Sequence, residues 1–369
     1  MIYFDHNATT PLDESVLQAM LPLLENFYGN PSSLYRAGRV VRSAIETARE
    51  QVAALVNVAP SQIIFTSGGT EANNFALKGL LPLSKVTISA IEHASILEPA
   101  WALKKQGIQV EELGVDEQGI AIAEVLENQV KKGVDLVSIM LANNETGVIQ
   151  DIESIAQSLH GKQVILHTDA IQALGKIPVD FKQLGVNLMS LSSHKIYGPK
   201  GCGALVFEQG VNLKPMLLGG GHENGLRAGT ENVAAIIGFG HAAQIARETL
   251  SQKQKKLLNL RKILESELKT ISGLIIFSEQ QYRLPNTVQF GLPGIDGEML
   301  LMQLDRKGIA VSSGSACSSE AGAPSHVLMA MGVDMALAKS AIRVSLGCHN
   351  TEAEVNSFVQ TLKSLVLAP

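Results

Sequence analysis

The chain has few cysteines and few aromatic residues, no excess of positive charge and no long apolar run. Three of its 369 residues are cysteines, Cys202, Cys317 and Cys348, and no C-x-x-C pair occurs, which disfavours a disulfide framework and a zinc ribbon. The formal net charge is −5 and aromatic residues make up 4%, so the basic surface that would bind a nucleic-acid backbone is missing. No apolar run approaches the roughly 20 residues that span a bilayer. Nucleic acid and membranes are therefore poor candidates as partners.

The N-terminus also lacks the pattern of a secretory signal. It reads "MIYFDHNATTP", with no basic segment followed by an apolar one, so we expect a cytoplasmic protein. The composition, 46% hydrophobic and 18% charged with 33 glycines, is typical of a globular α/β protein, and the length suggests two domains.

Apolar strand-like runs alternate with helical patterns from about residue 60 to 210, for example "KVTIS", "DLVSIMLA", "VILHTD" and "GALVFE". This alternation predicts βαβ units and a mostly parallel sheet with helices on both faces. In such sheets ligands bind at the carboxyl ends of the strands. Near residue 250 the pattern changes to a long polar helix, short strands and a final helix from about Glu352, so we expect a domain boundary there.

A glycine-containing turn, "TSGGTEANN", joins a predicted strand to a helix. Gly68 and Gly69 would let backbone N–H groups approach a phosphate at the helix N-terminus. The stretch matches neither a P-loop nor a dinucleotide-binding fingerprint, and taken alone it is more typical of a helix capped by Ser67 or Thr70.

Asp169 and Gln172 lie in "VILHTDAIQALGK", where Asp169 ends an apolar strand. A carboxylate at that position would favour a protonated partner such as a pyridinium nitrogen. A helix N-cap explains the same residues equally well.

Lys195 follows the strand "NLMSLSS" and precedes the sharp turn "YGPKG". The strand brings Ser192, His194 and Lys195 to the same sheet edge as Asp169. Because a lysine in a partly desolvated crevice is a usable nucleophile toward an aldehyde, Lys195 is placed to form a Schiff base with pyridoxal phosphate.

Ten motifs in order resemble the NifS-type cysteine desulfurases, within the class V, fold-type I pyridoxal-phosphate enzymes. The resemblance runs from residue 3 to beyond 350, and the motifs read "DHNATTP", "GNPSS", "SGGTEANN", "EHASIL", "NNETG", "HTDAIQ", "SSHKIYGPKG", "GGGHENGLRAGTEN", "SSGSACSS" and "AIRVSLG". The resemblance implies an α/β fold with a large domain over residues 14–250, built on a mostly parallel seven-stranded sheet. It also implies a smaller α+β domain from residues 1–13 and 251–369, which carries a cysteine loop at about 312–324.

The resemblance also implies a role for each site residue. Lys195 would bind the cofactor as a Schiff base, Asp169 would meet the pyridine nitrogen, Gln172 the phenolic oxygen, and His93 would stack on the ring and relay protons. The remaining implied contacts are Gly69, Thr70, Ser192 and His194 with the phosphate, Thr230 reaching over from a second subunit of a homodimer, and Asn144 and Arg343 with the substrate. Read singly, His93 could instead belong to a helix cap, and Arg343 could be an ordinary ion-paired arginine.

Cys317 is surrounded by small polar residues in "VSSGSACSSEAGAPSHVL", so we expect an exposed, mobile loop there. For Cys202 and Cys348 we expect buried structural thiols. The resemblance implies that Cys317, as a thiolate, takes sulfur from L-cysteine as a persulfide, releases L-alanine and passes the sulfur to an acceptor or iron–sulfur scaffold protein. The long loop resembles group I desulfurases, but only 26 residues follow Arg343, which leaves scaffold docking through a C-terminal extension in doubt.

Other functions use parts of the same pattern. A class V aminotransferase or a cysteine or selenocysteine lyase would share Lys195, Asp169 and His93, and a sulfur-relay protein could keep the fold without catalysis. A transaminase has no need for Cys317. An NTPase would need the Walker lysine spacing, which the chain lacks.

Overall fold

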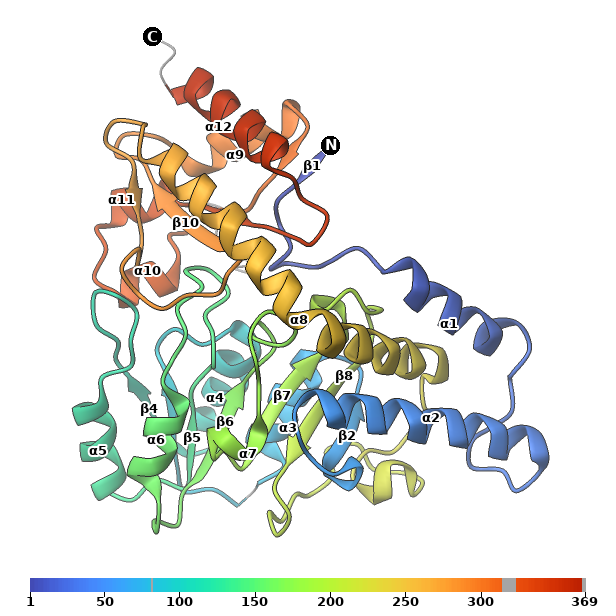
Figure 1. The fold of residues 1–369 in the computed structure, drawn as a ribbon. Coiled ribbons are helices and arrows are strands. Elements are labelled where there is room, and N and C mark those ends of the chain that lie inside the picture. Colours follow the sequence, from blue (N-terminus) through green and yellow to red (C-terminus); the bar gives the residue numbers. More distant parts are fainter. Residues whose placement is uncertain (81, 314–322, 367–369) are drawn as a thin grey trace.

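The computed structural model describes residues 1–80, 82–313 and 323–366. Its elements are shown in Figure 1. The strands are β1 (Ile2–Tyr3), β2 (Ile63–Thr66), β3 (Lys85–Ser89), β4 (Gln109–Leu113), β5 (Leu136–Ser138), β6 (Ile165–Asp169), β7 (Leu188–Ser192), β8 (Gly203–Phe207), β9 (Ile275–Ile276), β10 (Thr287–Gly291), β11 (Ile309–Ala310) and β12 (Ile342–Ser345). The helices are α1 (Glu14–Glu25), α2 (Arg36–Leu55), α3 (Gly69–Lys78), α4 (Ala94–Lys105), α5 (Ala123–Lys131), α6 (Ile152–Leu159), α7 (Phe181–Leu184), α8 (Val233–Leu268), α9 (Gly297–Arg306), α10 (His326–Ala330), α11 (Met335–Lys339) and α12 (Glu352–Val366). Short 3₁₀ turns are η1 (Pro60–Gln62), η2 (Ser193–Lys195) and η3 (His222–Gly225).

The large sheet has seven strands in the order β2-β8-β7-β6-β5-β3-β4. Neighbouring strands are parallel except where β8 pairs antiparallel with β2 and β7. The α/β fold with a mostly parallel seven-stranded sheet is therefore confirmed.

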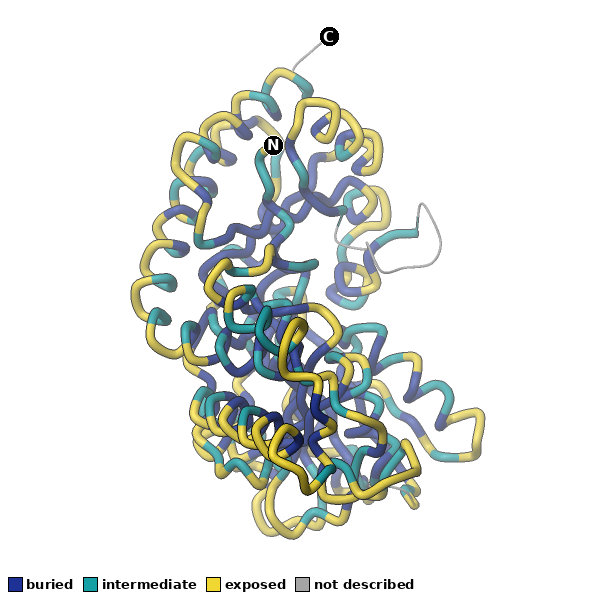
Figure 2. Tube along the Cα trace, turned by 90° about the vertical axis from the view of Figure 1, so that its right-hand side faces the viewer, coloured by how far each residue is buried: buried dark blue, intermediate teal, exposed yellow. Residues whose placement is uncertain are grey.

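Helices cover both faces of this sheet because its strands are apolar on both sides. On β2, Ile63 and Phe65 belong to a core that includes residues of α2 and α8. Ile64, between them, belongs to a second core with residues of α3 and α4. Successive strand side chains point to opposite faces, so this alternation gives the three-layer arrangement, and Figure 2 shows the buried residues running through its middle.

The C-terminal part has its own core around the sheet β12-β10-β9. α8 connects the two parts as one continuous helix of 36 residues that passes through residue 250 (Figure 1). Its residues up to Ala246 pack in the large core, whereas those from Leu257 pack in the C-terminal core. A domain division near residue 250 stays a prediction, and it would fall inside this helix.

The N-terminal segment lies against both parts. β1 pairs in parallel with β11, and Phe4 is fully buried in the C-terminal core beside Phe358. A few residues later, the Thr10 N–H donates to the carbonyl oxygen of His194 at 3.1 Å, at the edge of the large sheet. In the described part of the chain, no helix combines the length and apolarity needed to span a bilayer.

Candidate active site

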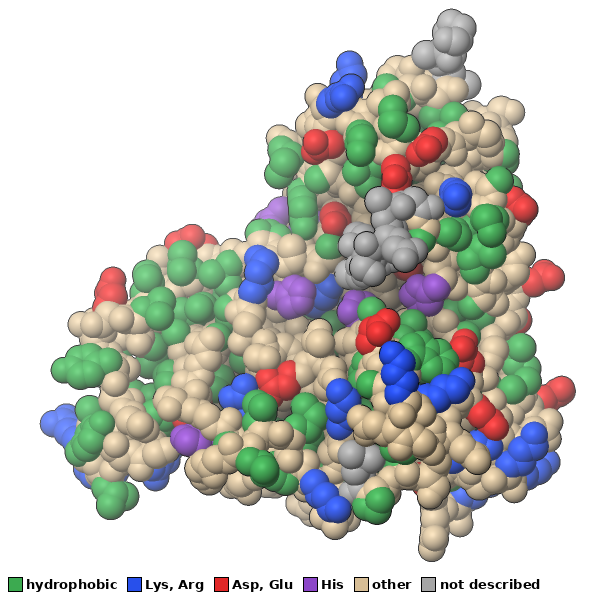
Figure 3. All heavy atoms as spheres, turned by 180° about the vertical axis from the view of Figure 1, so that it is seen from behind, with side chains coloured by type: hydrophobic (Ala, Val, Ile, Leu, Met, Phe, Trp, Pro, Cys, Tyr) green, Lys and Arg blue, Asp and Glu red, His purple; other side chains and the backbone are tan. Residues whose placement is uncertain are grey.

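A cavity of about 220 Å³ lies at the carboxyl ends of the parallel strands. Asp169 ends β6 and Ser192 ends β7, and the register pairs Asp169 with Ser190 on the neighbouring strand. Seen from behind, the junction between the two parts of the molecule is hollowed, and histidine side chains gather there (Figure 3). The predicted site residues that line the cavity are Gly69, Thr70, His93, Asn144, Asp169, Gln172, Ser192, His194 and Lys195.

Lys195 ends the 3₁₀ turn η2, directly after β7. The following turn needs a left-handed residue, Tyr197, at φ 68°. The Lys195 Nζ is part-buried and donates hydrogen bonds to the backbone carbonyl oxygens of Ala8, at 2.8 Å, and Asn7. The N-terminal segment thus holds the lysine amine at the cavity wall, where an aldehyde could reach it.

Asp169 is 5% exposed at the base of the cavity. Its Oδ2 accepts from Asn73 Nδ2 at 2.7 Å, and its Oδ1 accepts from the Ile171 N–H at 2.9 Å. Burial raises the pKa of Asp169, and these hydrogen bonds oppose the rise. A buried carboxylate of this kind is stabilised by a cationic partner, such as a protonated ring nitrogen.

The helix-cap alternative for His93 is confirmed, and its predicted stacking on the cofactor ring and its proton relay stay predictions. It is the N-cap of α4, where its Nδ1 accepts from the Ser95 N–H at 3.1 Å, and it also lines the cavity. Because Nδ1 accepts a backbone hydrogen bond, the proton of the neutral ring is on Nε2. Burial lowers the pKa of His93, while nearby Asp169 opposes the shift.

The start of α3 and the end of β7 form a wall suited to an anion. A Cβ on Gly69 would lie 2.2 Å from Ile171 Cδ1, so a larger residue where the helix begins would require the Ile171 side chain to move. Ser192 Oγ is buried and has no hydrogen-bond partner among the described residues, and His194 lies three residues before Tyr197 on the same wall. A helix N-terminus, a spare hydroxyl and a nearby imidazole fit a phosphate group. With Lys195 and Asp169, this donor set fits pyridoxal phosphate.

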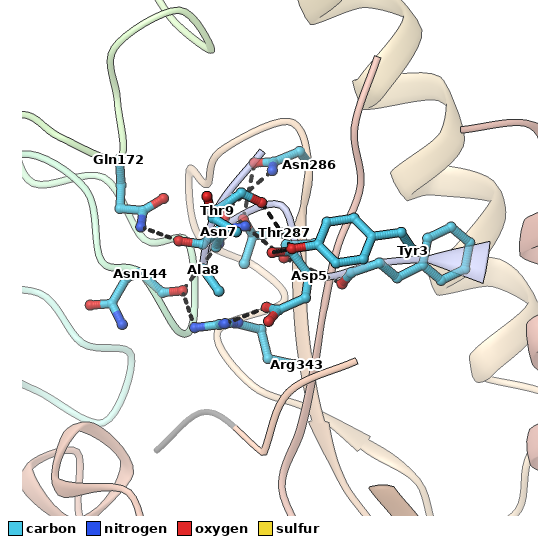
Figure 4. Close-up of polar contacts among 12 residues, drawn as sticks. Tyr3, Asp5, Asn7, Ala8, Thr9, Asn144, Gln172, Asn286, Thr287 and Arg343 are labelled. Atoms are coloured by element: carbon cyan, nitrogen blue, oxygen red, sulfur yellow. Dashed lines mark hydrogen bonds and ion pairs between the residues drawn. The ribbon is translucent and has the colours of Figure 1, made fainter. Parts of the chain in front are cut away.

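Asn144 lines the cavity and contacts polar residues behind it that come from segments far apart in the chain (Figure 4). We call Asn144, Arg343 and Asp5 together the opposite wall. Arg343 on β12 is 3% exposed; its Nη2 donates to Asp5 Oδ1 at 2.6 Å, and its Nη1 donates to the Asn144 carbonyl oxygen at 3.2 Å. Arg343 does not line the 220 Å³ cavity itself but contacts Asn144, which does. The ion pair considered for Arg343 is therefore present, and its buried Nε is unpartnered in the described structure.

Comparison with known proteins places this geometry in a family. The class-V aminotransferase model matches residues 2–358. The chain belongs to the class-V aminotransferase family. Among this family's curated members, a cysteine desulfurase IscS from Dictyoglomus turgidum is 42% identical over 371 residues, covering 99% of this chain and 94% of the relative.

Solved structures agree with this assignment. A NifS-like protein superposes with a TM-score of 0.93 at 39% identity, covering 99% of both chains. A structure described as SspA in complex with cysteine has a TM-score of 0.83 at 31% identity, covering 95% of this chain and 100% of the other. These comparisons confirm the resemblance to NifS-type desulfurases that the motifs predicted.

Thr230 is a predicted site residue that lines another cavity. It is exposed and lines a different cavity of about 160 Å³, together with Cys202, Ser67 and Arg227. Arg227 pairs with Glu71 of α3, Nε to Oε1 at 2.9 Å. Within one chain, Thr230 and Lys195 therefore line different cavities.

The three cysteines differ in what the structure describes. Cys202 is 1% exposed, as predicted, and burial raises the pKa of its thiol. The prediction for Cys348 was wrong: it is only half-buried, because it follows β12 in a surface turn where its N–H donates to the Tyr197 hydroxyl. Cys317 lies outside the described residues.

Both described ends of the cysteine segment adjoin site residues. Before it, Ser312 forms a backbone bridge with Arg343, with N–H to O distances of 3.1 and 2.6 Å. After it, the Nε2 of His326 lies 2.9 Å from the carbonyl oxygen of Glu92, the residue before His93. Ser312 and His326 therefore contact a predicted site residue and the neighbour of another.

Sequence reasoning missed two buried residues behind the cavity wall, Asn7 and Lys176. Asn7 lies in the quoted motif "DHNATTP", which was the available signal. Lys176 follows "DAIQALG" in the Asp169 segment, and its only signal was a lysine within an otherwise apolar turn.

Proposed function

We propose that this chain is a pyridoxal-phosphate-dependent cysteine desulfurase, which converts L-cysteine to L-alanine and holds the sulfur as a persulfide on Cys317. The observation that carries the proposal is the convergence of nine predicted residues on one cavity around the Lys195 amine. The cysteine desulfurases and the cysteine complex among its relatives support the same substrate.

The cofactor, when bound, supplies an aldehyde for a lysine amine and a ring that withdraws electrons from the substrate carbons. Around it, Lys195 provides the amine and moves the substrate Cα proton, and Asp169 keeps the ring nitrogen protonated. Ser192, His194 and the N-terminus of α3 bind the phosphate. His93, with its Nε2 proton available, relays protons.

Substrate recognition falls to the opposite wall. Arg343 would bind the substrate carboxylate through its guanidinium fork, a geometry that a lysine cannot reproduce. Asp5 holds that guanidinium in place at 2.6 Å, and Asn144 lines the cavity beside it.

The sulfur-transfer step balances without an external oxidant. The Cys317 thiolate attacks the sulfur of the substrate, an S–S bond forms as the substrate C–S bond breaks, and the released carbon takes up a proton to give alanine. The thiol of the enzyme becomes a persulfide, which a sulfur-acceptor protein, such as an iron–sulfur scaffold, then consumes.

A Cys317→Ala variant tests this function against its alternatives. We expect the variant to keep the visible absorbance of the bound cofactor and to lose sulfide release from L-cysteine in the presence of a thiol reductant. The matched control is Cys202→Ala, which removes a buried thiol outside the Lys195 cavity. Unchanged sulfide release by Cys317→Ala would reject the desulfurase in favour of a lyase, and amino transfer to a keto acid would favour an aminotransferase.

The active enzyme is, in this proposal, a homodimer in which Thr230 of one subunit completes the cavity of the other. Thr230 and Lys195 line separate cavities of one chain, and this separation supports the arrangement. Mixed dimers of Lys195→Ala and Thr230→Ala subunits would each contain one native site, so a refolded mixture should regain up to about a quarter of the wild-type activity. Activity no higher than the sum of the two separate variants would contradict a shared site.

A further inference from the structure

Lys176 is a buried lysine directly behind the wall of the 220 Å³ cavity. It is 6% exposed, and its Nζ donates to Gln172 Oε1 at 2.8 Å and to Asn7 Oδ1 at 2.9 Å. Burial lowers the pKa of Lys176 well below its usual range. Burial removes the water that would otherwise hydrate the Lys176 amine. The hydrogen bonds to the two amide oxygens compensate for that loss.

Lys176 and the Asn7 carbonyl oxygen together determine which way the Gln172 amide faces. An amine of lysine has donors to offer these oxygens, so the Gln172 carbonyl must face Lys176 and the amide nitrogen must face away. That nitrogen donates to the Asn7 carbonyl oxygen at 2.9 Å. Its second N–H remains for the cavity, which Gln172 lines. The reversed amide would lose both hydrogen bonds and would present an oxygen where the N–H now lies.

The same lysine fixes Asn7, which connects the two walls (Figure 4). Asn7 Oδ1 accepts from Lys176 and from Asn286 Nδ2 at 3.1 Å, so its Nδ2 must point the other way. Asn7 Nδ2 donates to Thr287 Oγ1 at 2.9 Å and to the Asn144 carbonyl oxygen at 3.1 Å. The backbone carbonyl of Asn7 in turn accepts from Lys195.

We propose that Lys176 is a positioning residue that fixes the amides of Gln172 and Asn7, so that an N–H of Gln172 donates to the phenolic oxygen of bound pyridoxal phosphate. The inference deepens the proposed function and rests on it. Lys176 does not line the 220 Å³ cavity that contains Asp169, although it shares a smaller pocket with Lys195. Its side-chain contact with a residue of the larger cavity is the hydrogen bond to Gln172.

The test is the pH titration of the visible absorbance of cofactor-loaded Lys176→Met, recorded without substrate. Methionine keeps an unbranched chain of similar length and removes the donors. A hydrogen bond to the phenolic oxygen favours its anion and makes it a weaker base, so its loss should raise the titration midpoint by about one pH unit. The matched control is Lys162→Met, at an exposed lysine, and should leave the midpoint unchanged.

A double variant separates positioning from an independent electrostatic effect. Gln172→Leu should raise the midpoint as Lys176→Met does, and Lys176→Met combined with Gln172→Leu should raise it no further, because the lysine acts through the glutamine. Additive shifts, or an unchanged midpoint in Lys176→Met, would overturn the inference. Lys176→Gln replaces Lys176→Met if the latter does not fold: its amide can donate or accept, so the orientation is lost and the midpoint should again rise. Wild-type protein that binds no chromophore would overturn the proposed function as well.

Discussion

The two walls of the Lys195 cavity are assembled in different ways. The sheet wall takes Ser192, His194 and Lys195 from four consecutive residues at the end of β7. The opposite wall joins Arg343 to Asp5, 338 positions away in sequence, and to Asn144, 199 positions away. These three residues of the cofactor side therefore take their positions from one strand and its turn, although the N-terminal segment also holds the Lys195 amine. The substrate side depends on the packing of the N-terminal segment between the two parts of the molecule. Variants of the two walls should consequently fail in different ways.

The largest effect is expected on the sheet wall, from Lys195→Ala. The loss of the amine held by the Ala8 carbonyl removes the covalent link to the cofactor, so we expect no visible absorbance from a bound imine and a fall in turnover of about 10³-fold or more. Absorbance spectra and sulfide assays check this, with Lys162→Ala as the control. Residual turnover near the wild-type level would mean that Lys195 is not the reacting lysine.

On the opposite wall, Arg343→Lys should raise the KM for L-cysteine while leaving the cofactor spectrum intact. The change removes the fork that would bind a carboxylate and weakens the pair with Asp5. A charge-assisted bidentate contact contributes about 2–3 kcal/mol, which corresponds to a rise in KM of roughly 30- to 150-fold. Asp5→Asn, which keeps a hydrogen-bond acceptor beside the arginine, should raise KM by less. An altered cofactor spectrum with an unchanged KM would show that Arg343 acts on the cofactor and does not bind the substrate carboxylate.

A smaller effect, on stability rather than activity, is expected from the histidines. Burial lowers the pKa of His6, next to Asp5, to about 4, and that of His194, on the sheet wall, also to about 4. Between pH 4 and 6.5 the unfolded chain binds more protons at these positions than the folded chain, so the free energy of unfolding falls as the pH falls through that window.

His6→Phe isolates the contribution of the substrate side. Phenylalanine keeps an aromatic ring beside Tyr3, whose ring centroid lies 5.0 Å from that of His6, but does not titrate. The loss of stability between about pH 7 and about pH 5 should be smaller in the variant by up to about 2 kcal/mol. Urea unfolding at the two pH values measures it. An identical pH dependence in wild type and variant would show that His6 titrates normally in the folded protein.

The same contrast explains how much could be predicted from the sequence. Apolar runs separated by amphipathic stretches are local signals, so the parallel sheet and the sheet-wall residues were predicted. The antiparallel direction of β8 has no local signal, because it depends on pairing with β2 and β7. The sequence pattern predicts a change near residue 250, but α8 continues through that point. The pattern changes there because the first half of the helix packs in the large core and the second half packs in the C-terminal core.

Contacts between distant polar groups were the part that sequence patterns could not predict. Lys176 and Asn7 meet across 169 positions, and neither residue has a spacing that marks a buried amide–amine contact. The half-buried Cys348 was mispredicted for a similar reason: its exposure depends on the turn after β12 and on the distant Tyr197 hydroxyl, not on the general tendency of free cysteines to be buried.

The central proposal is that this chain carries the sulfur of its substrate on one cysteine, Cys317. Peptide mass measurement of the cofactor-loaded protein after incubation with L-cysteine, without reductant, tests it most directly. We predict one added sulfur atom on the peptide that contains Cys317 and none on those that contain Cys202 or Cys348. Alanine formation with no sulfur on the Cys317 peptide would contradict the account.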